Sequence, residues 1–301
     1  MTKRELSAAG IANPALAASY NHCRRINAAH GKTYYLATLL LPPAKRPYVH
    51  ALYGFARYAD DIVDSLDDKP VSQRSAALAE LADRFFIDLE RGHSDHPVCA
   101  ATVDTALRWG IDTEYFEAFI DSMQMDLHID HYDTYADLET YVYGSAAVIG
   151  LQMVPILEPS DRRAFDYAKD LGIAFQLANF IRDVGEDLER NRIYLPLDEL
   201  AEFGVSADDV RARVVTPQLR AALAAQIDRV RRLEEQSRPG IAMLAPDSQP
   251  CIETARVLYC GIVDEVENID YEVFTKRAKV PLNRRLAVAV PAWRKARRAR
   301  R

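Results

Sequence analysis

Apolar residues recur at intervals of three and four along most of this chain, which is the spacing of one face of an α-helix. The clearest example is residues 216–237, where Thr216 stands as an N-cap and Pro217 takes the first helical position. Similar patterns predict helices at 14–29, 45–66, 72–91, 97–109, 113–130, 135–156, 160–189, 249–275 and 281–298. Because no stretch of strand length alternates convincingly between apolar and polar residues, the pattern predicts an all-α fold.

Helix ends and connections can also be read from the sequence. Gly110 stands where a helix C-cap would, and Ser206 with Asp209 forms a capping-box pattern. The stretch 238–250 is richer in Pro, Gly and Ser, but it is short and is expected to connect two helices. We therefore expect one domain over residues 1–301, with its core at about 14–290 and a basic C-terminal tail at 291–301.

Charge is distributed unevenly along the 301 residues, although the formal net charge is only −6. No acidic residue follows Glu272, whereas 11 of the 38 basic residues lie in 273–301, which leaves residues 1–272 with a net charge of −17. A basic tail can bind anionic lipid, bind nucleic acid nonspecifically or remain a solvated terminus. Peripheral membrane contact through the tail is retained as a possibility, and no nucleic-acid partner is expected.

Several classes of protein are excluded. The four cysteines show no C-x-x-C spacing, and the N-terminal segment does not have the pattern of a secretion signal. There is no run of 18 apolar residues and no Gly-rich dinucleotide or P-loop motif. The sequence therefore predicts a reduced cytoplasmic protein without a membrane-spanning segment, and it leaves peripheral membrane contact open.

Acidic side chains form two groups at helical spacing. In LYGFARYADDIVDS, Asp60 and Asp64 share a helix face and Arg57 lies one turn before them. In QLANFIRDVGEDLERNRIYLP, residues 176–196, four oxygen-bearing side chains follow one arc of the predicted helix, namely Gln176, Asn179, Asp183 and Asp187. Gly185 disfavours this helix, which predicts the close approach of another helix or of a bulky group.

A pair of Asp residues four positions apart is by itself a weak sign of a metal site. The chain contains other such pairs, namely Asp126/Asp130, Asp133/Asp137 and Asp166/Asp170. The two groups above differ because apolar and aromatic residues surround them, which places their helices in the core. Carboxylates about 6 Å apart repel by roughly 3 kcal/mol at an effective dielectric constant of 20, so such a group inside a cavity needs a cation. Asp and Asn oxygens suit Mg²⁺, which commonly bridges carboxylates to phosphates.

Three long blocks carry a family resemblance, in the right order and at the right spacing. They are KTYYLATLLLPPAKRPYVHALYGFARYADDIVD (32–64), YVYGSAAVIG (141–150) and the block at 176–196. Together they resemble the squalene/phytoene synthase family, and YEVFTKRAKVP (271–281) resembles its C-terminal end. The resemblance covers essentially residues 20–285.

The resemblance implies an isoprenoid synthase fold, in which helices surround a central cavity. It implies a Mg²⁺-dependent prenyl transferase, with Mn²⁺ as a possible substitute, that joins two prenyl diphosphates head to head. The residues of blocks 32–64 and 271–281 favour the phytoene branch of the family. That branch uses two geranylgeranyl diphosphates, passes through a cyclopropyl (prephytoene) diphosphate and needs no NADPH. Two alternatives remain open: a squalene or dehydrosqualene synthase that acts on farnesyl diphosphate, and a helical scaffold that binds lipid or partner proteins.

The matched motif positions imply roles for individual residues. The metal–diphosphate ligands would be Asp60, Asp64, Asn179, Asp183 and Asp187. The diphosphate contacts would be Lys32, Arg57, Arg182, Tyr259 and Arg277. Tyr53, Tyr143 and Gln176 would lie near the reacting carbons, where the two tyrosine rings could stabilise cations. Arg277 could instead neutralise Glu272, and Tyr259 could instead be a core residue.

One position departs from the family pattern. Many members have Ser before the motif lysine, whereas this chain has Gly31 before Lys32. A hydroxyl contact to diphosphate would therefore be missing, and the neighbouring His30 is a candidate replacement.

Overall fold

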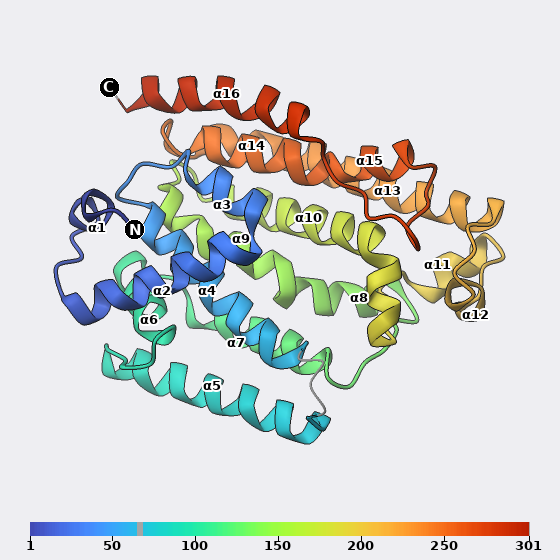
Figure 1. Cartoon of the computed structure of the whole chain (residues 1–301), viewed down its shortest axis with the longest axis horizontal. Helices are drawn as coiled ribbons and strands as arrows, with labels where there is room; N and C mark the ends of the chain where they lie inside the picture. Colours follow the sequence, from blue (N-terminus) through green and yellow to red (C-terminus); the bar gives the residue numbers. More distant parts are fainter. Residues whose placement is uncertain (65–68, 301) are drawn as a thin grey trace.

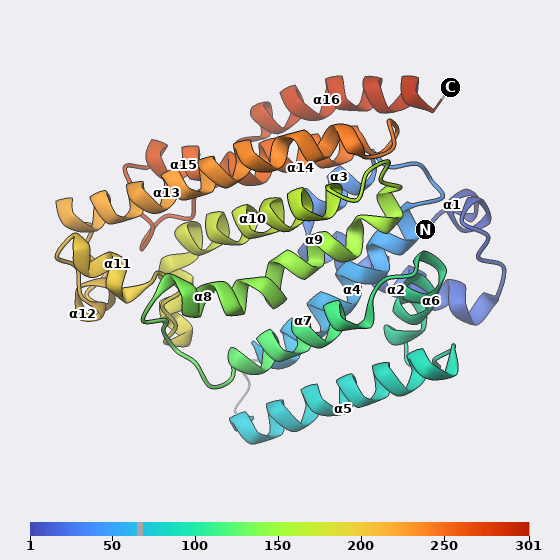
Figure 2. The same cartoon turned by 180° about the vertical axis from the view of Figure 1, so that it is seen from behind.

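The computed structural model describes residues 1–64 and 69–300, and these form a stack of helices (Figures 1 and 2). In chain order the α-helices are α1 (Lys3–Ala8), α2 (Pro14–His30), α3 (Lys32–Thr38), α4 (Arg46–Val63), α5 (Val71–Arg91), α6 (Cys99–Trp109), α7 (Thr113–Met125), α8 (Tyr135–Val142), α9 (Val148–Met153), α10 (Ala164–Asp187), α11 (Leu197–Glu202), α12 (Ala207–Arg211), α13 (Pro217–Ser237), α14 (Gln249–Cys260), α15 (Ile262–Asn268) and α16 (Leu282–Ala299). A π-helical turn, η1 (Tyr143–Ala147), joins α8 to α9, and 3₁₀ turns occupy η2 (Pro155–Leu157), η3 (Leu188–Arg190) and η4 (Arg238–Met243).

The predicted all-α class is confirmed within the described residues, where β pairing is limited to an isolated bridge between His131 and Ile193. The predicted caps are also confirmed: Thr216 accepts a hydrogen bond from Leu219 N at 3.1 Å, and Gly110 adopts the left-handed conformation with φ 58°. Ser206 likewise begins α12 through a capping box. Local sequence signals were therefore sufficient to fix these ends.

Some predicted helix limits were wrong. The helix expected at 249–275 is divided at Gly261, and its second part ends at Asn268 because Asp270 and Tyr271 adopt left-handed backbone conformations. The helix expected at 135–156 contains the π-helical turn η1. The short helices α1, α3 and α11 were not predicted, since each spans too few residues to show a periodic pattern. The last two residues of the helix predicted at 45–66 lie outside the described residues.

The arrangement of the helices places α10 in the interior. Helix α10 packs against α13, α14, α15, α9 and η1, while α5 and α16 lie at opposite edges of the molecule (Figures 1 and 2). Gly144 in η1 allows α7 to approach closely, because a Cβ atom there would overlap the Ala118 carbonyl oxygen and Ser122 Oγ. This close packing fixes η1 against α7 on the inner side of the stack.

The C-terminal segment is not a separate tail. Helix α16 runs without a break through Pro291 to Ala299, so the structure shows no boundary at residue 291. Its inner side contacts α14, and Ala296 is fully buried. Within residues 1–64 and 69–300, no helix is long and apolar enough to cross a membrane.

Candidate active site

Two cavities meet in the interior. One is polar and has a volume of about 940 Å³, and the other is apolar and has a volume of about 290 Å³. They share a wall formed by Tyr53, Ala56, Ser145, Ile149, Gln176, Asn179 and Tyr259. A ligand with a charged end and a hydrocarbon end would therefore find both environments side by side.

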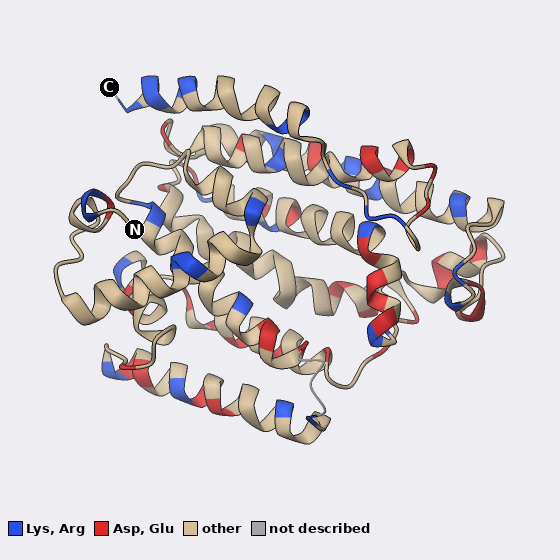
Figure 3. Cartoon of the chain, viewed as in Figure 1, with Lys and Arg blue, Asp and Glu red and all other residues tan. Residues whose placement is uncertain are grey.

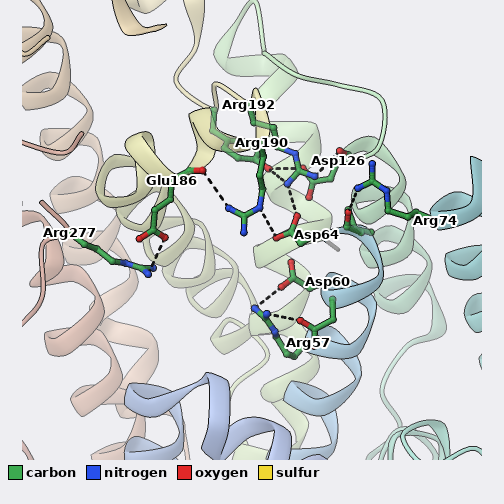
Figure 4. Close-up of polar contacts among 12 residues, drawn as sticks. Arg57, Asp60, Asp64, Arg74, Asp126, Glu186, Arg190, Arg192 and Arg277 are labelled. Atoms are coloured by element: carbon green, nitrogen blue, oxygen red, sulfur yellow. Dashed lines mark hydrogen bonds and ion pairs between the residues drawn. The ribbon is translucent and has the colours of Figure 1, made fainter. Parts of the chain in front are cut away.

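Helix α4 supplies one acidic wall of the polar cavity. Asp60 and Asp64 both face into it, and Arg57 pairs with Asp60 at 2.9 Å (Figure 4). Burial and the neighbouring Asp64 carboxylate raise the pKa of Asp60 to about 7, against the opposing effect of Arg57. The helical spacing predicted from the sequence thus brings two carboxylates together in a site where one of them resists ionisation.

Helix α10 supplies the facing wall. Asn179, Asp183 and Asp187 line the polar cavity along this helix, as the sequence predicted. Burial and the nearby Asp183 carboxylate raise the pKa of Asp187 to about 8. Each acidic wall therefore has a carboxyl group whose negative charge is not fully balanced by positive groups of the protein.

Arginines hold Asp183 from two sides. Arg182 Nε donates to it at 2.7 Å, and Arg277 lies 3.1 Å from the same carboxylate and 3.0 Å from Glu186. The alternative partner for Arg277, Glu272, is thus not the one it uses. Both arginines line the polar cavity and are placed to neutralise an anion bound there.

Gly185 explains how Arg277 reaches this position. A Cβ at Gly185 would lie 2.8 Å from the Val273 carbonyl oxygen and 2.9 Å from that of Phe274. The predicted close approach is therefore present, and it is made by the backbone of a turn instead of a helix or a bulky group. This contact brings residues 273–277 against the acidic face of α10.

A buried network behind α4 holds Asp64. Arg192 Nη1 donates to Asp64 at 2.8 Å, and its Nη2 donates to the Asp126 carbonyl oxygen at 2.9 Å (Figure 4). The Asp126 carboxylate in turn accepts hydrogen bonds of 2.7 Å from both Tyr141 and Tyr194. Arg192 is thus held in place by buried groups, and it fixes the orientation of the Asp64 carboxylate.

The chemistry of the cavity fits a divalent cation. Asn179 Oδ1 is buried without a hydrogen-bond partner, and the two raised pKa values show carboxylates in need of positive charge. Among the described residues, however, no group of three His, Cys, Asp or Glu side chains could hold an ion by itself. A cation here would take its remaining ligands from water or from a substrate diphosphate, as Mg²⁺ commonly does.

The structure contradicts the expected position of Tyr143. Its side chain is 39% exposed and lines neither cavity, whereas Tyr141, two residues earlier, is buried and lines the polar cavity. The two tyrosines stand in the same motif, YVYGS, and differ because residues two positions apart on a helix point to nearly opposite sides. The family motif located the segment correctly, but Tyr143, the residue assigned from it, reaches neither cavity.

These two tyrosines should differ in their effect on stability. Tyr141→Phe removes a donor to buried Asp126 and should cost about 1–3 kcal/mol of unfolding free energy. Tyr143→Phe should change it by less than about 0.5 kcal/mol, because the residue is on the surface. Urea denaturation of both variants measures this, and equal effects would contradict the assignment of Tyr141 to the network.

The other predicted site residues all line the polar cavity. They are Lys32, Arg57, Gln176, Arg182, Tyr259 and Arg277, with Tyr53 at the junction of the two cavities. Tyr259 also stacks on Phe175 with ring centroids 4.8 Å apart, so it belongs both to the packing and to the site. Sequence reasoning missed further lining residues, namely Asp126, Tyr141, Lys279, Arg285, Arg192 and Tyr194.

The local packing explains why position 31 is a glycine. A Cβ there would lie 2.6–2.7 Å from the ring atoms of Tyr53, so serine would collide with the ring in its present position. His30 lines the polar cavity beside Gly31, as a replacement for the absent hydroxyl would need to do. The departure from the family pattern thus accompanies a particular placement of Tyr53.

Comparison with known proteins identifies the family. The model of the squalene/phytoene synthase family matches residues 27–284. This chain belongs to the squalene/phytoene synthase family. The earlier resemblance is confirmed, and the motifs that carried it account for both acidic walls of the cavity.

Relatives within the squalene/phytoene synthase family include named enzymes. A 15-cis-phytoene synthase from Synechococcus elongatus is 38% identical over 90% of this chain and 91% of its own length. A chloroplastic phytoene synthase from Arabidopsis thaliana is 35% identical over 93% of this chain and 67% of its own length.

Solved structures in the family have the same fold. A dehydrosqualene synthase in complex with a ligand superposes with a TM-score of 0.85 at 26% identity, over 94% of this chain and 98% of its own. A squalene synthase from Alicyclobacillus acidocaldarius gives a TM-score of 0.79 at 26% identity, over 88% of this chain and 98% of its own. The isoprenoid synthase fold expected from the resemblance is therefore confirmed.

Proposed function

We propose that this protein is a phytoene synthase that condenses two molecules of geranylgeranyl diphosphate head to head. The single observation that supports this most strongly is the junction of a doubly acidic polar cavity with an apolar cavity. The 38% identity to a cyanobacterial 15-cis-phytoene synthase favours the C20 substrate over the C15 one. The family is a prenyl transferase family, generally dependent on divalent metal ions.

The reaction would proceed in two halves. In the first, one C1–O bond breaks with loss of diphosphate, the C2=C3 alkene of the second substrate attacks C1, and proton loss closes a cyclopropyl diphosphate. In the second, this intermediate loses its own diphosphate, its ring rearranges and a further proton is lost to give the conjugated triene of phytoene. Two diphosphates and two protons are released for each C40 product.

Residues of the polar cavity would bind and orient the diphosphates. Lys32, Arg57, Arg182 and Arg277 supply positive charge at the cavity wall. The ligands for Mg²⁺ would be Asp60, Asp64, Asn179, Asp183 and Asp187. When bound, Mg²⁺ draws negative charge from the departing diphosphate and so promotes cleavage of the C1–O bond.

The junction of the cavities would hold the reacting carbons. Tyr53, Gln176 and Tyr259 lie there, and the faces of the two tyrosine rings attract a developing carbocation. The apolar cavity beyond would hold the hydrocarbon chain and exclude water that would quench the cation. Gln176, which lines both cavities, would orient the substrate by hydrogen bonding.

A product assay tests the proposal. The purified protein is incubated with Mg²⁺ and either geranylgeranyl or farnesyl diphosphate, with and without NADPH, and the hydrocarbon is identified. We expect a C40 product from the C20 substrate without NADPH. A C30 product would favour a squalene or dehydrosqualene synthase, the function named for the structural neighbours. No product from either substrate would favour the non-enzymatic scaffold.

The pKa values predict a pH-dependent effect of Mg²⁺ on stability. Asp60 and Asp187 titrate near 7 and 8 in the folded protein but near 3.8 when unfolded. The folded state therefore holds extra protons between these values, and the metal-free protein loses stability as the pH rises from about 4 to about 8. Mg²⁺ needs the ionised carboxylates, so the rise in Tm on adding MgCl₂ should be larger at about pH 8 than at about pH 6. A shift independent of pH would contradict this.

We also propose that the protein works at a membrane surface, because its hydrocarbon product is insoluble in water. No described helix could cross a membrane, so the contact would be peripheral. The basic C-terminal end, which includes residues 291–300, is the part of the chain best suited to anionic lipid.

A further inference from the structure

Helix α16 carries an exposed apolar stripe. Leu282, Leu286, Val290 and Trp293 are 69%, 53%, 44% and 51% exposed. At 100° per residue these four side chains fall within about 80° of the helix circumference. A different side of the helix, with Val288, Ala292 and Ala296, packs on the body of the protein. The stripe is therefore not needed for the packing of α16.

Positive charge borders the stripe. Arg294, Arg297 and Arg298 are exposed. Arg294 and Arg298 continue around the helix from the stripe, whereas Arg297 follows Trp293 on the same side, with its guanidinium 5.4 Å from the centre of the Trp293 ring. Figure 3 shows basic residues on α16 with no acidic residue among them. Among the residues that the structure describes, no carboxylate is within ion-pair distance of these three arginines.

We infer that this face of α16 docks on the surface of an anionic lipid bilayer. An amphipathic helix with Leu and Trp on one side and Arg beside them lies in the bilayer interface, where its apolar side chains enter the headgroup region. Each arginine near an anionic surface adds to the attraction. A second copy of this chain fits the face less well, because it would offer the three unpaired arginines more positive charge where an anionic bilayer offers negative charge.

The position of α16 relates this surface to the site. Val288 on its inner side packs against a cluster that contains Leu258 and Ile262, and both of these residues line the polar cavity. Arg285, in the first turn of α16, lines the same cavity. A bilayer on the exposed side of α16 would therefore be separated from the cavity by α16 itself and by the side chains of Leu258 and Ile262. That a lipophilic substrate or product benefits from this proximity rests on the proposed function. The docking itself does not.

The experiment is vesicle co-sedimentation with the full-length protein. The vesicles are made of phosphatidylcholine, either alone or with a minor fraction of phosphatidylglycerol. The wild-type protein should pellet with the anionic vesicles, less so at high salt, and only weakly with phosphatidylcholine alone. The double variant L286S/W293S should lower the partition coefficient by at least about tenfold, because two apolar anchors are lost.

A matched control separates the stripe from general surface hydrophobicity. Leu107 on α6 is 51% exposed, like Trp293, and L107S should bind vesicles as the wild type does. Circular dichroism checks that each variant is folded. Unchanged pelleting of L286S/W293S, or an equal loss in L107S, would overturn the proposal. So would a wild-type dimer that L286S/W293S converts to a monomer in analytical ultracentrifugation. Since binding is measured without turnover, its failure is distinct from failure of the product assay.

Discussion

Asp183→Asn should lower the rate of phytoene formation by at least about 100-fold while the protein remains folded. Asp183 lies on the inner wall of the polar cavity, and its carboxylate is the point at which Arg182 and Arg277 converge. The amide keeps the shape but removes the charge that would help hold the metal–diphosphate cluster. Loss of one well-placed electrostatic group commonly costs about 10²–10³ in rate. Asp60→Asn should act in the same direction from the opposite wall.

Asp166→Asn is the matched control for Asp183→Asn. Asp166 lies on the same helix, in its first turn, but is exposed and lines neither cavity. Its replacement should leave turnover unchanged. The second measurement is the rise in Tm on adding MgCl₂, which Asp183→Asn should reduce and Asp166→Asn should not. Full activity in both Asp60→Asn and Asp183→Asn would exclude a reaction that depends on the two acidic walls.

Arg192→Met should destabilise the protein by about 3 kcal/mol, which is typical when one partner of a buried ion pair is removed. The substitution takes the closest partner from Asp64 and a donor from the Asp126 carbonyl oxygen. Arg190 Nε, at 3.7 Å from Asp64, is too distant to replace the lost hydrogen bond. The free energy of unfolding from urea denaturation measures the loss.

Arg211→Met provides the comparison for Arg192→Met. Arg211 pairs with Asp208 at 3.3 Å on the surface of α12, where both side chains are solvated. Its removal should leave the free energy of unfolding nearly unchanged, since exposed ion pairs contribute little. An equally small effect of Arg192→Met would show that water replaces the guanidinium and that the network does not hold Asp64.

The sequence predicted the acidic walls because their residues are close together along the chain. The spacing of Asp60 with Asp64, and of Asn179 with Asp183, is fixed by the helix itself. By contrast, Asp126 looked like one of several chance acidic pairs. Only the fold brings it to Arg192 and Tyr194, about 66 residues away in sequence, where it becomes the centre of a buried network.

Helix limits and residue choice within motifs were harder to predict. The left-handed backbone at Asp270 and Tyr271 ends α15. Neither residue is a glycine, which would have indicated a turn in the sequence. Tyr143 was assigned to the cavity by motif match, and a motif does not reveal which side of a helix faces inward. The π-helical turn that begins at Tyr143 changes the direction of the side chains that follow, and no rule of regular periodicity includes it.

Helix α10 contributes to both cavities, and this limits how the hydrocarbon site can be redesigned. The apolar cavity is lined by Leu171, Gly172 and Phe175, and the polar cavity is lined by Asp183 and Asp187 of the same helix. If α10 were redesigned to accept longer or shorter hydrocarbon chains, the carboxylates would shift together with the apolar wall. The apolar wall is also built by Ala37 and Thr38 on α3 and by Cys251, Ile252 and Ala255 on α14, helices that carry none of the four carboxylates. Libraries aimed at new chain lengths should therefore vary these five positions and leave α10, Lys32 and Tyr259 unchanged.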